Sequence, residues 1–136
     1  LFKLPGCVFV NLQYGDTKAE VAAASGQGIH FSDAVQIDLT NDIDAVASLV
    51  NACDRIVSVS NSTAHIAGAL GKEVLLMLPY RIGKLWYWSE AKGEGSLWYP
   101  TVTTFHQSAQ GDWRNAIEEV EDELSQRINR KELTAS

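Results

Sequence analysis

The chain has 136 residues, of which 46% are hydrophobic and 21% charged, and these values fit one globular domain and exclude disordered and collagen-like proteins. Its formal net charge of −6 argues against a general nucleic-acid-binding protein, because phosphate backbones need a basic surface. The longest apolar run, residues 74–79, is too short to cross a bilayer and no basic-then-apolar leader is present, so we expect a cytoplasmic location.

The first half of the chain predicts strands and helices in alternation. Short apolar runs indicate the strands, and turn residues follow them. The helix after Asp42 has an acidic N-cap and four apolar residues at helical spacing, namely Ile43, Val46, Leu49 and Val50. In chain order we expect a strand over residues 8–12, an alanine-rich helix over 17–25 broken by Gly26 and Gly28, a weak strand over 35–39 and a helix over 43–53.

The second half continues the alternation with more strongly apolar strands. Runs of β-branched and apolar residues without polar alternation indicate strands that are buried on both faces. We expect a strand over 55–60, a helix from Asn61-Ser62 to Leu70 stopped by Gly71, a strand over 73–78, a Trp-rich loop over 79–100, a short strand over 102–105 and a final helix from Gly111-Asp112. That final helix carries one apolar stripe, formed by Trp113, Ile117, Val120, Leu124 and Ile128.

This order of elements predicts one α/β domain over residues 1–136, a Rossmann-like three-layer sandwich with a mostly parallel sheet. Parallel strands that are apolar on both faces need helices on both sides of the sheet. In such sheets ligands bind beyond the carboxyl ends of the strands, near the point where the strand order reverses. We therefore expect functional loops at residues 13–16, 39–42, 60–65 and from 79 onward.

The segment of residues 56–71 carries the strongest chemical signal. It predicts a strand, a tight polar turn and a helix whose first turn consists of small residues. Unpaired backbone N–H groups at such a helix start favour a phosphate group, and the helix dipole adds to this. Ser62, Thr63 and Ala64 are small enough to let a diphosphate approach the backbone. The alternative is that Asn61 and Ser62 only cap the helix, as these residue types commonly do.

Metal binding is not expected. The three histidines are scattered, and Cys7 and Cys53 lack a C-x-x-C spacing, so we interpret both cysteines as buried reduced thiols. Asp42-Ile43-Asp44 has the spacing of a metal-binding Asp-x-Asp. Our preferred interpretation is a helix cap followed by a first-turn acid, both stabilised by the helix N-terminus.

Residues 54–72, DRIVSVSNSTAHIAGALGK, resemble the signature of glycosyltransferase family 9, the heptosyltransferase-like enzymes. They are most similar to versions of that domain at the C-termini of tetratricopeptide-repeat proteins. Those versions continue, as this chain does, with a strand ending in proline, a Trp-rich loop, Trp-Tyr-Pro (98–100), Phe-x-Gln (105–107) and Gly-Asp-Trp (111–113). Residues 9–16 resemble the first strand and loop of the domain. The match is strong over residues 42–113 and weak over 17–35.

The resemblance implies a GT-B glycosyltransferase, with two Rossmann-like domains, the active site between them and no metal requirement. This chain would be the donor-binding half of an inverting enzyme and a piece of a longer protein. Its partners would be a nucleoside diphosphate sugar and an acceptor-binding domain on the N-terminal side of Leu1. No catalytic residue is expected in this chain, because the family's base lies on the acceptor domain.

By position, the resemblance assigns the donor contacts to the carboxyl edge of the sheet. The residues against the diphosphate and sugar would be Ser60, Asn61, Ser62, Thr63 and His65. Gln13 would lie near the phosphates, and Leu39, Thr40 and Asn41 near the base or ribose. Arg81 or Lys84 would neutralise charge on the departing nucleotide. Ser60 departs from the family, which has an acidic residue at that position.

Ser60 in place of the acid also favours an alternative, a non-catalytic interaction module with the same fold. The tryptophans between Trp86 and Trp98 fit either stacking on a base or sugar or docking of a partner domain. For His65 we expect that replacement by alanine leaves the fold intact, because Ile66, Ala69 and Leu70 would form the buried face. The same change should weaken ligand binding by about 1–2 kcal/mol.

Overall fold

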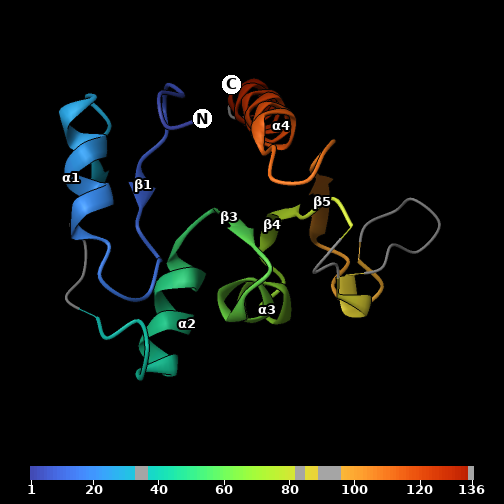
Figure 1. Cartoon of the computed structure of the whole chain (residues 1–136), viewed down its shortest axis with the longest axis horizontal. Coiled ribbons are helices and arrows are strands. Elements are labelled where there is room, and N and C mark those ends of the chain that lie inside the picture. Colours follow the sequence, from blue (N-terminus) through green and yellow to red (C-terminus); the bar gives the residue numbers. More distant parts are fainter. Residues whose placement is uncertain (33–36, 82–84, 89–95, 135–136) are drawn as a thin grey trace.

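The computed structural model describes residues 1–32, 37–81, 85–88 and 96–134. Within them the chain forms a mixed α/β fold with two parallel sheets (Figure 1). β1 (Phe9–Val10) pairs with β2 (Phe31–Ser32) in the first sheet. β3 (Arg55–Val59), β4 (Glu73–Leu78) and β5 (Val102–His106) form the second sheet in that order. The parallel pairing predicted from the alternation of elements is confirmed, whereas the single sheet that we expected is divided into two sheets in the described part of the chain.

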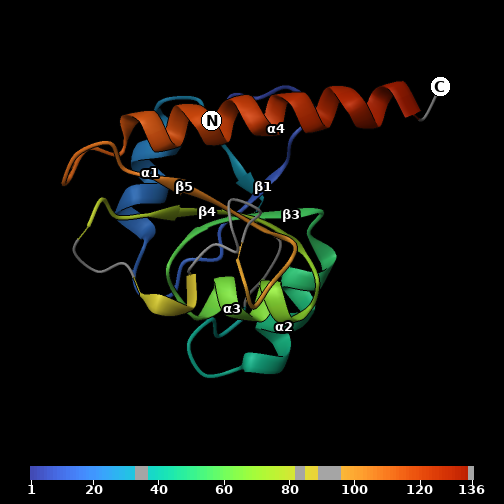
Figure 2. The same cartoon turned by 90° about the vertical axis from the view of Figure 1, so that its right-hand side faces the viewer.

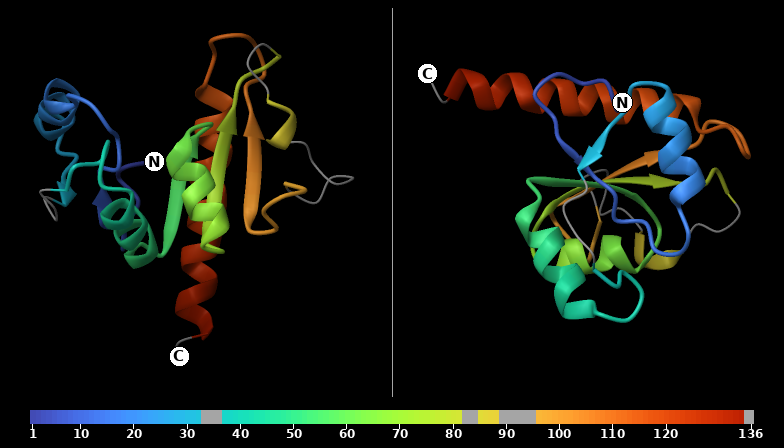
Figure 3. Two further views of the ribbon diagram at one scale, coloured as in Figure 1. Left: turned by 90° about the horizontal axis from the view of Figure 1, so that it is seen from below. Right: turned by 90° about the vertical axis from the view of Figure 1, so that its left-hand side faces the viewer.

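Helices cover both faces of the three-stranded sheet. Figure 2 shows α4 (Arg114–Thr134) along one face, and α2 (Ile43–Ala52) and α3 (Ser62–Ala69) on the other. The left panel of Figure 3 shows the three strands pointing the same way, and α1 (Lys18–Gly26) lies beside β1. The three layers follow from strands that carry apolar side chains on both faces.

β4 is the centre of the fold, because its side chains alternate between two cores. Val74, Leu76 and Leu78 belong to the core under α2 and α3, whereas Leu75 belongs to the core under α4. All four are fully buried. Successive side chains of a strand point to opposite faces, so a strand between two helical layers is apolar throughout. The partners are Val46, Val50, Ala64 and Ala67 on the first side, and Phe105, Ala116, Val120 and Leu124 on the second.

The helices predicted after Asp42 and Asn61 are confirmed together with their caps. Asp42 Oδ1 accepts the N–H of Ala45 at 2.9 Å, and Asn61 Oδ1 accepts that of Ala64 at 3.0 Å. Gly71, with a φ of +70°, follows α3 in the left-handed conformation that glycine adopts without strain. The strands predicted over 55–60, 73–78 and 102–105 are confirmed as β3, β4 and β5.

The strand predicted over residues 35–39 is wrong where the structure describes it. Residues 35 and 36 lie outside the described residues, residues 37–39 form no strand, and the second strand is Phe31–Ser32. The reason is Asp38, whose carboxylate accepts the N–H of Thr40 at 3.0 Å and of Asn41 at 3.1 Å. This side-chain-to-backbone pattern holds the chain in a turn and competes with a strand.

Other predicted elements are present with different bounds. The first strand is shorter than residues 8–12, and Val8 before it is 82% exposed. α1 extends through Gly26 and is not broken there. The predicted Trp-rich loop lies partly outside the described residues, and inside it Trp86–Trp88 forms a 3-10 helix.

The predicted apolar faces are confirmed for most of their residues, and single members of each are wrong, because the rotation of a helix on the sheet depends on its smallest side chains. In α3, Ala69 and Leu70 are exposed. The buried face is Thr63, Ala64, Ala67 and Gly68, which lets the helix backbone lie close to the sheet. In the same way Ala116 of α4 is buried and Ile117 is exposed, and Ile43 of α2 is exposed.

The cysteines differ from the expectation of buried thiols. Cys7 and Cys53 are both free and only half-buried. Burial raises the pKa of the Cys53 thiol, which keeps it in the less reactive protonated form. Among the described residues, no group of three or more His, Cys, Asp or Glu side chains is placed to hold a metal ion. No helix in the described part of the chain is long and apolar enough to span a membrane.

At the start of α4, Asp112 should titrate far below the usual range of a carboxyl group. Arg114 Nε and Nη2 donate to its two oxygens at 2.9 and 2.6 Å, and the Arg114 N–H donates at 3.1 Å. Hydrogen bonds from the Arg114 side chain first, and from its backbone second, lower the pKa of Asp112 to about 2.

Because this folded-state pKa lies below the unfolded value, any stabilisation from Asp112 is present above about pH 4 and is lost as the pH falls toward 2. An NMR titration of the Asp112 carboxyl carbon measures the pKa directly. In Arg114→Ala the pKa should return toward the ordinary range. A pKa of Asp112 that is the same with and without Arg114 would contradict this assignment.

Candidate functional site

The predicted anion site lies at the carboxyl end of β3, where the chain turns through Ser60 and Asn61 into α3. The side-chain oxygen of Asn61 caps the helix. It accepts hydrogen bonds from the N–H of Ala64 and, at 3.1 Å, from the hydroxyl of Ser58. The backbone N–H groups of Ser62 and Thr63 have no hydrogen-bond partner among the described residues. Capping and anion binding are therefore compatible, because the cap satisfies one donor and leaves two.

The residues that carry and follow these two N–H groups have small side chains. Ser62 is exposed, Thr63 is buried at 6% exposure, and Ala64 is fully buried. The small residues place no bulk over the helix start, and the dipole of α3 adds partial positive charge there. Chemically, this is an arrangement that can accept an anionic oxygen without a charged side chain.

Ser60, at the position where the resemblance predicts an acid, contacts the Trp-rich loop between β4 and β5, which we call the aromatic loop. Its hydroxyl accepts the indole N–H of Trp88 at 2.8 Å, and Trp88 is completely buried. A carboxylate would accept the same hydrogen bond with a negative charge, so serine keeps the contact and removes the charge. Sequence reasoning did not find Trp88 as a partner, because no local pattern relates two residues that are 28 positions apart.

His65 lies in an aromatic cluster, which we define as Tyr87, Trp88 and Tyr99 around the imidazole ring. Nδ1 of His65 is 3.1 Å from the Tyr99 hydroxyl oxygen. The ring stacks on Trp88 with centroids 4.5 Å apart, and it meets Tyr87 edge-on at 4.9 Å. His65 thus joins α3 to the loop. We expected His65→Ala to leave the fold intact because Ala69 and Leu70 would form the buried face of α3. Those two residues are exposed, and His65 itself packs against three aromatic rings, so that expectation loses its basis.

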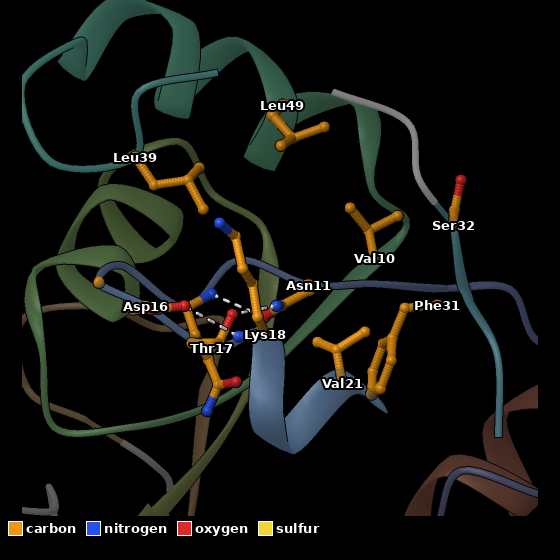
Figure 4. A pocket seen from close by; sticks show the side chains of 12 residues that line it. Val10, Asn11, Asp16, Thr17, Lys18, Val21, Phe31, Ser32, Leu39 and Leu49 are labelled. Atoms are coloured by element: carbon orange, nitrogen blue, oxygen red, sulfur yellow. Dashed lines mark hydrogen bonds between the residues drawn. The ribbon is translucent and has the colours of Figure 1, made fainter. Parts of the chain in front are cut away.

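Gln13 and Leu39 meet in a cavity of about 630 Å³ beside β1 (Figure 4). This volume is within the range of small-molecule sites. The Lys18 side chain extends from the start of α1 toward Leu39. Asn11, also in the lining, donates from Nδ2 to Thr17 Oγ1 at 3.0 Å. The complete described lining is Val10, Asn11, Gln13, Gly15, Asp16, Thr17, Lys18, Val21, Phe31, Ser32, Leu39 and Leu49.

The cavity is tied to the start of α3 through the core. Leu39 and Leu12 pack against the same core cluster that contains Ala64 of α3. The sequence analysis did not identify Asn11 and Lys18 as site residues. The signal that could have identified them is the helix that begins shortly after the first strand. Their convergence with Leu39 depends on the fold, which brings the first loop and the turn before α2 to one place.

The other residues predicted to contact the donor are not brought into the cavity or to the start of α3. Thr40 and Asn41 are exposed, donate to Asp38, and are not part of the described lining of the cavity. Arg81 is exposed, and its guanidinium lies over the Tyr80 ring at 5.0 Å. Lys84 lies outside the described residues.

No family model matches the chain, and no solved structure matches it significantly. The chain is similar to Protein FlbA of Caulobacter vibrioides, with 37% identity over 110 residues. The aligned part is 80% of this chain and 18% of FlbA, so the chain spans less than a fifth of that relative. The name FlbA states no ligand or reaction, and the resemblance to glycosyltransferase family 9 stays a prediction.

Proposed function

We propose that this chain binds the donor of a sugar transfer, a nucleoside diphosphate sugar, with the diphosphate at the start of α3. The observation that carries the proposal is the pair of unpaired N–H groups of Ser62 and Thr63 at the carboxyl end of a parallel strand. Parallel sheets bind ligands beyond this edge, and helix starts bind phosphates there. The first turn of α3 contains no lysine or arginine side chain, so the backbone N–H groups and the helix dipole supply the positive charge there.

The cavity beside β1 supports a ligand longer than a diphosphate alone. It combines apolar walls such as Phe31 and Leu39 with polar groups from Gln13, Asn11 and Lys18. A nucleoside has the same mixed character, with a flat apolar base and a ribose that forms hydrogen bonds. We infer that the nucleoside occupies this cavity and that Lys18 supplies positive charge near the phosphates.

In the reaction proposed, an acceptor hydroxyl attacks the anomeric carbon while the bond from that carbon to the diphosphate oxygen breaks. Negative charge then builds on the departing diphosphate. The N–H groups of Ser62 and Thr63 would stabilise that charge more in the transition state than in the bound donor. The proton of the hydroxyl passes to a base that we do not assign to this chain, so the isolated chain should bind the donor without transferring sugar.

Ser62→Asp gives the sharpest test, because the two roles of the helix start predict opposite effects. A carboxylate in the first turn of a helix stabilises it, so the stability of the fold should stay equal or rise by about 0.3–1 kcal/mol. The same carboxylate repels a diphosphate, so we expect affinity for nucleoside diphosphates to fall at least about tenfold. Calorimetric titration and urea unfolding of the same variant measure the two effects.

Ser62→Ala is the matched control, since it removes the hydroxyl without adding charge and should change affinity less than about threefold. The parent chain should bind at least one nucleoside diphosphate with a Kd on the order of 10 µM to 1 mM, because half of a two-domain cleft leaves the ligand partly exposed. Absence of binding to all common nucleoside diphosphates, or equal affinity for Ser62→Asp and Ser62→Ala, would refute the proposed site.

A second candidate function, a non-catalytic interaction module, has one specific observation in its favour. Ser60 is not a free polar group at the sheet edge, because its hydroxyl already accepts the N–H of Trp88. A module that kept the fold and lost the acid would show this arrangement. Failure of every nucleoside diphosphate to bind favours this second function.

A further inference from the structure

A second cavity, of about 660 Å³, lies at the amino ends of the strands, at the sheet edge opposite the start of α3. Its lining includes Arg55 and Glu73, which are the first residues of β3 and β4, and Thr101, which directly precedes β5. Figure 2 and the left panel of Figure 3 show that α4 runs opposite to the strands, so its C-terminal half lies over their amino ends. We call this space the amino-edge cavity. Its volume is within the range of small-molecule sites.

The sheet face under α4 changes from apolar to charged as it reaches this cavity. Side chains two positions apart in a strand share a face. Val57 and Leu75 pack in the core under α4, whereas Arg55 and Glu73, two positions earlier in each strand, line the cavity. Arg55 and Glu73 are neighbours in the register of β3 and β4, and Arg55 Nε donates to Glu73 Oε2 at 2.6 Å. The layer under α4 therefore ends in a pair of charges.

α4 contributes an arginine that is fixed from three sides. Arg127 Nε donates to Glu123 Oε1 at 2.6 Å, and Arg127 Nη2 donates to Thr103 Oγ1 at 3.4 Å. Its Nη1 lies 3.4 Å from Glu73 Oε1. The side chains of Arg55 and Arg127 are 21% and 18% exposed. Both arginines are therefore held in place largely out of water, and a site that is ordered in advance loses less entropy when a ligand binds.

The lining has one more positive than negative charge, although the chain as a whole is acidic with a net charge of −6. Its charged residues in the described part of the chain are three arginines and two glutamates, namely Arg55, Arg127, Arg130, Glu73 and Glu123. Asp54 and Lys72, which adjoin the lining in the sequence, add one charge of each sign, and so do Lys131 and Glu132. The neighbouring charges thus leave the excess of one positive charge unchanged.

Two groups in the lining have hydrogen bonds to donate and no acceptor for them. Thr101 Oγ1 is buried and has no hydrogen-bond partner among the described residues. Arg55 uses Nε for Glu73, whereas its two terminal NH2 groups form no hydrogen bond with another described residue. Buried donors without an acceptor destabilise a fold, and charged donors do so more strongly than neutral ones. An anionic oxygen ligand in the cavity would satisfy both groups.

The charge and the donors of the cavity fit a carboxylate that carries hydroxyl groups. The planar guanidinium group matches a carboxylate or a phosphate. One positive charge is neutralised by a carboxylate, whereas a phosphate dianion would add a surplus negative charge beside two glutamates. Glu73 and Glu123 keep free lone pairs that accept hydrogen bonds from hydroxyl groups. The volume is larger than a carboxylate alone needs, so the ligand has a body that carries those hydroxyls.

We propose that the amino-edge cavity binds a small hydroxy carboxylate, with the carboxylate at Arg55 and Thr101 and the hydroxyls at Glu73 and Glu123. This site is independent of the proposed donor site, which lies at the other edge of the sheet. The alternative is that the charges only hold α4 on the sheet, in which case no ligand binds there.

The test is an NMR titration of the full chain at pH 7 that follows the Thr101 amide and the Arg55 Nε–H. The probes are lactate, gluconate and glucuronate, each compared with an uncharged counterpart (1,2-propanediol, sorbitol and glucose), and glucose 6-phosphate. At least one carboxylate should bind with a Kd on the order of 0.1–1 mM. Its counterpart should bind at least about tenfold more weakly, because it lacks the charge. The amides of Ser62 and Thr63 should not shift with these probes.

Two variants separate ligand binding from a structural role. Thr101→Val should lower the affinity about tenfold and leave the midpoint of urea unfolding equal or higher, because the hydroxyl has no described partner to lose. Arg55→Lys keeps a positive charge beside Glu73 and loses the terminal NH2 groups, so it should also lower the affinity about tenfold. Arg114→Lys is the matched control, because Arg114 belongs to α4, its side chain is 85% exposed and it is outside the described lining. That variant should bind as the parent chain does.

The proposal is overturned if no carboxylate binds, if glucose 6-phosphate binds more tightly than glucuronate, or if the amides that shift belong to the start of α3. It is also overturned if Thr101→Val or Arg55→Lys, while folded, binds the carboxylate as tightly as the parent chain. Nucleoside diphosphates should shift the amides of Ser62 and Thr63 and leave Thr101 unchanged. The failure of either proposed site is therefore recognisable by itself.

Discussion

Replacing Trp88 with alanine should lower the free energy of unfolding by about 3–5 kcal/mol, the usual cost of removing a large aromatic side chain from a core. Trp88 is completely buried and belongs to the core cluster under α2 and α3. It also stacks on His65 and donates its indole N–H to Ser60 at 2.8 Å. The substitution would open a cavity and leave the Ser60 hydroxyl without its donor. Urea unfolding followed by circular dichroism measures the loss.

Two further variants separate the parts of this effect. Trp88→Phe keeps a ring in the core and loses the hydrogen bond, so it should cost about 1–2 kcal/mol, less than the alanine variant. Trp86→Ala removes the same side-chain type from a position that is 70% exposed, and it should change stability by less than about 0.5 kcal/mol. Equal losses for Trp88→Ala and Trp86→Ala would show that Trp88 does not anchor the aromatic loop.

Gly68→Ala should lower the free energy of unfolding by about 1–2 kcal/mol, although alanine is the better helix former. A Cβ on Gly68 would lie 2.6 Å from Cγ of Tyr99, and 2.9 and 3.0 Å from Cδ1 and Cδ2. The ring cannot withdraw freely, because its hydroxyl lies 3.1 Å from Nδ1 of His65. Overpacking costs about 1–3 kcal/mol, and alanine in a helix interior gains at most about 1 kcal/mol, so we expect the clash to win.

A double-mutant cycle with Tyr99→Ala identifies the cause. Once the ring is absent, Gly68→Ala should no longer destabilise, and the two substitutions should show a coupling energy of more than about 1 kcal/mol. Gly26→Ala is the control glycine, because it also lies in a helix and a Cβ there meets no described atom within 4 Å. That variant should be neutral or slightly more stable. If Gly68→Ala behaves like Gly26→Ala, Tyr99 does not pack against α3.

The contacts of Trp88 and Tyr99 also determine the geometry of the candidate site. Trp88 and Tyr99 both belong to the loop between β4 and β5, and both contact the segment between Ser60 and Gly68. The loop therefore fixes the position of the turn that starts α3. A change in loop packing should alter diphosphate binding as well as stability, so affinity has to be compared among variants of similar stability.

The sequence by itself determined the features that depend on neighbouring residues. The caps at Asp42 and Asn61, the end of α3 at Gly71 and the apolar strand over residues 73–78 all follow from patterns within one or two turns of chain. The alternation of these elements also determined the parallel pairing of β3, β4 and β5, because strands joined by crossovers in one sheet run in the same direction. The helix start with small residues was recognisable for the same local reason.

Only the tertiary structure decided which side chains meet. Ser60 pairs with Trp88 across 28 positions and His65 with Tyr99 across 34, and neither spacing corresponds to a period of a helix or strand. The buried face of α3 depended on close approach of Gly68 to the Tyr99 ring, which placed Ala69 and Leu70 outside. Hydrophobicity patterns state that a helix has a buried face, whereas the fit of particular side chains against the sheet and the loop sets its rotation. That fit is a property of the whole fold, and it brings the start of α3 and the aromatic loop together.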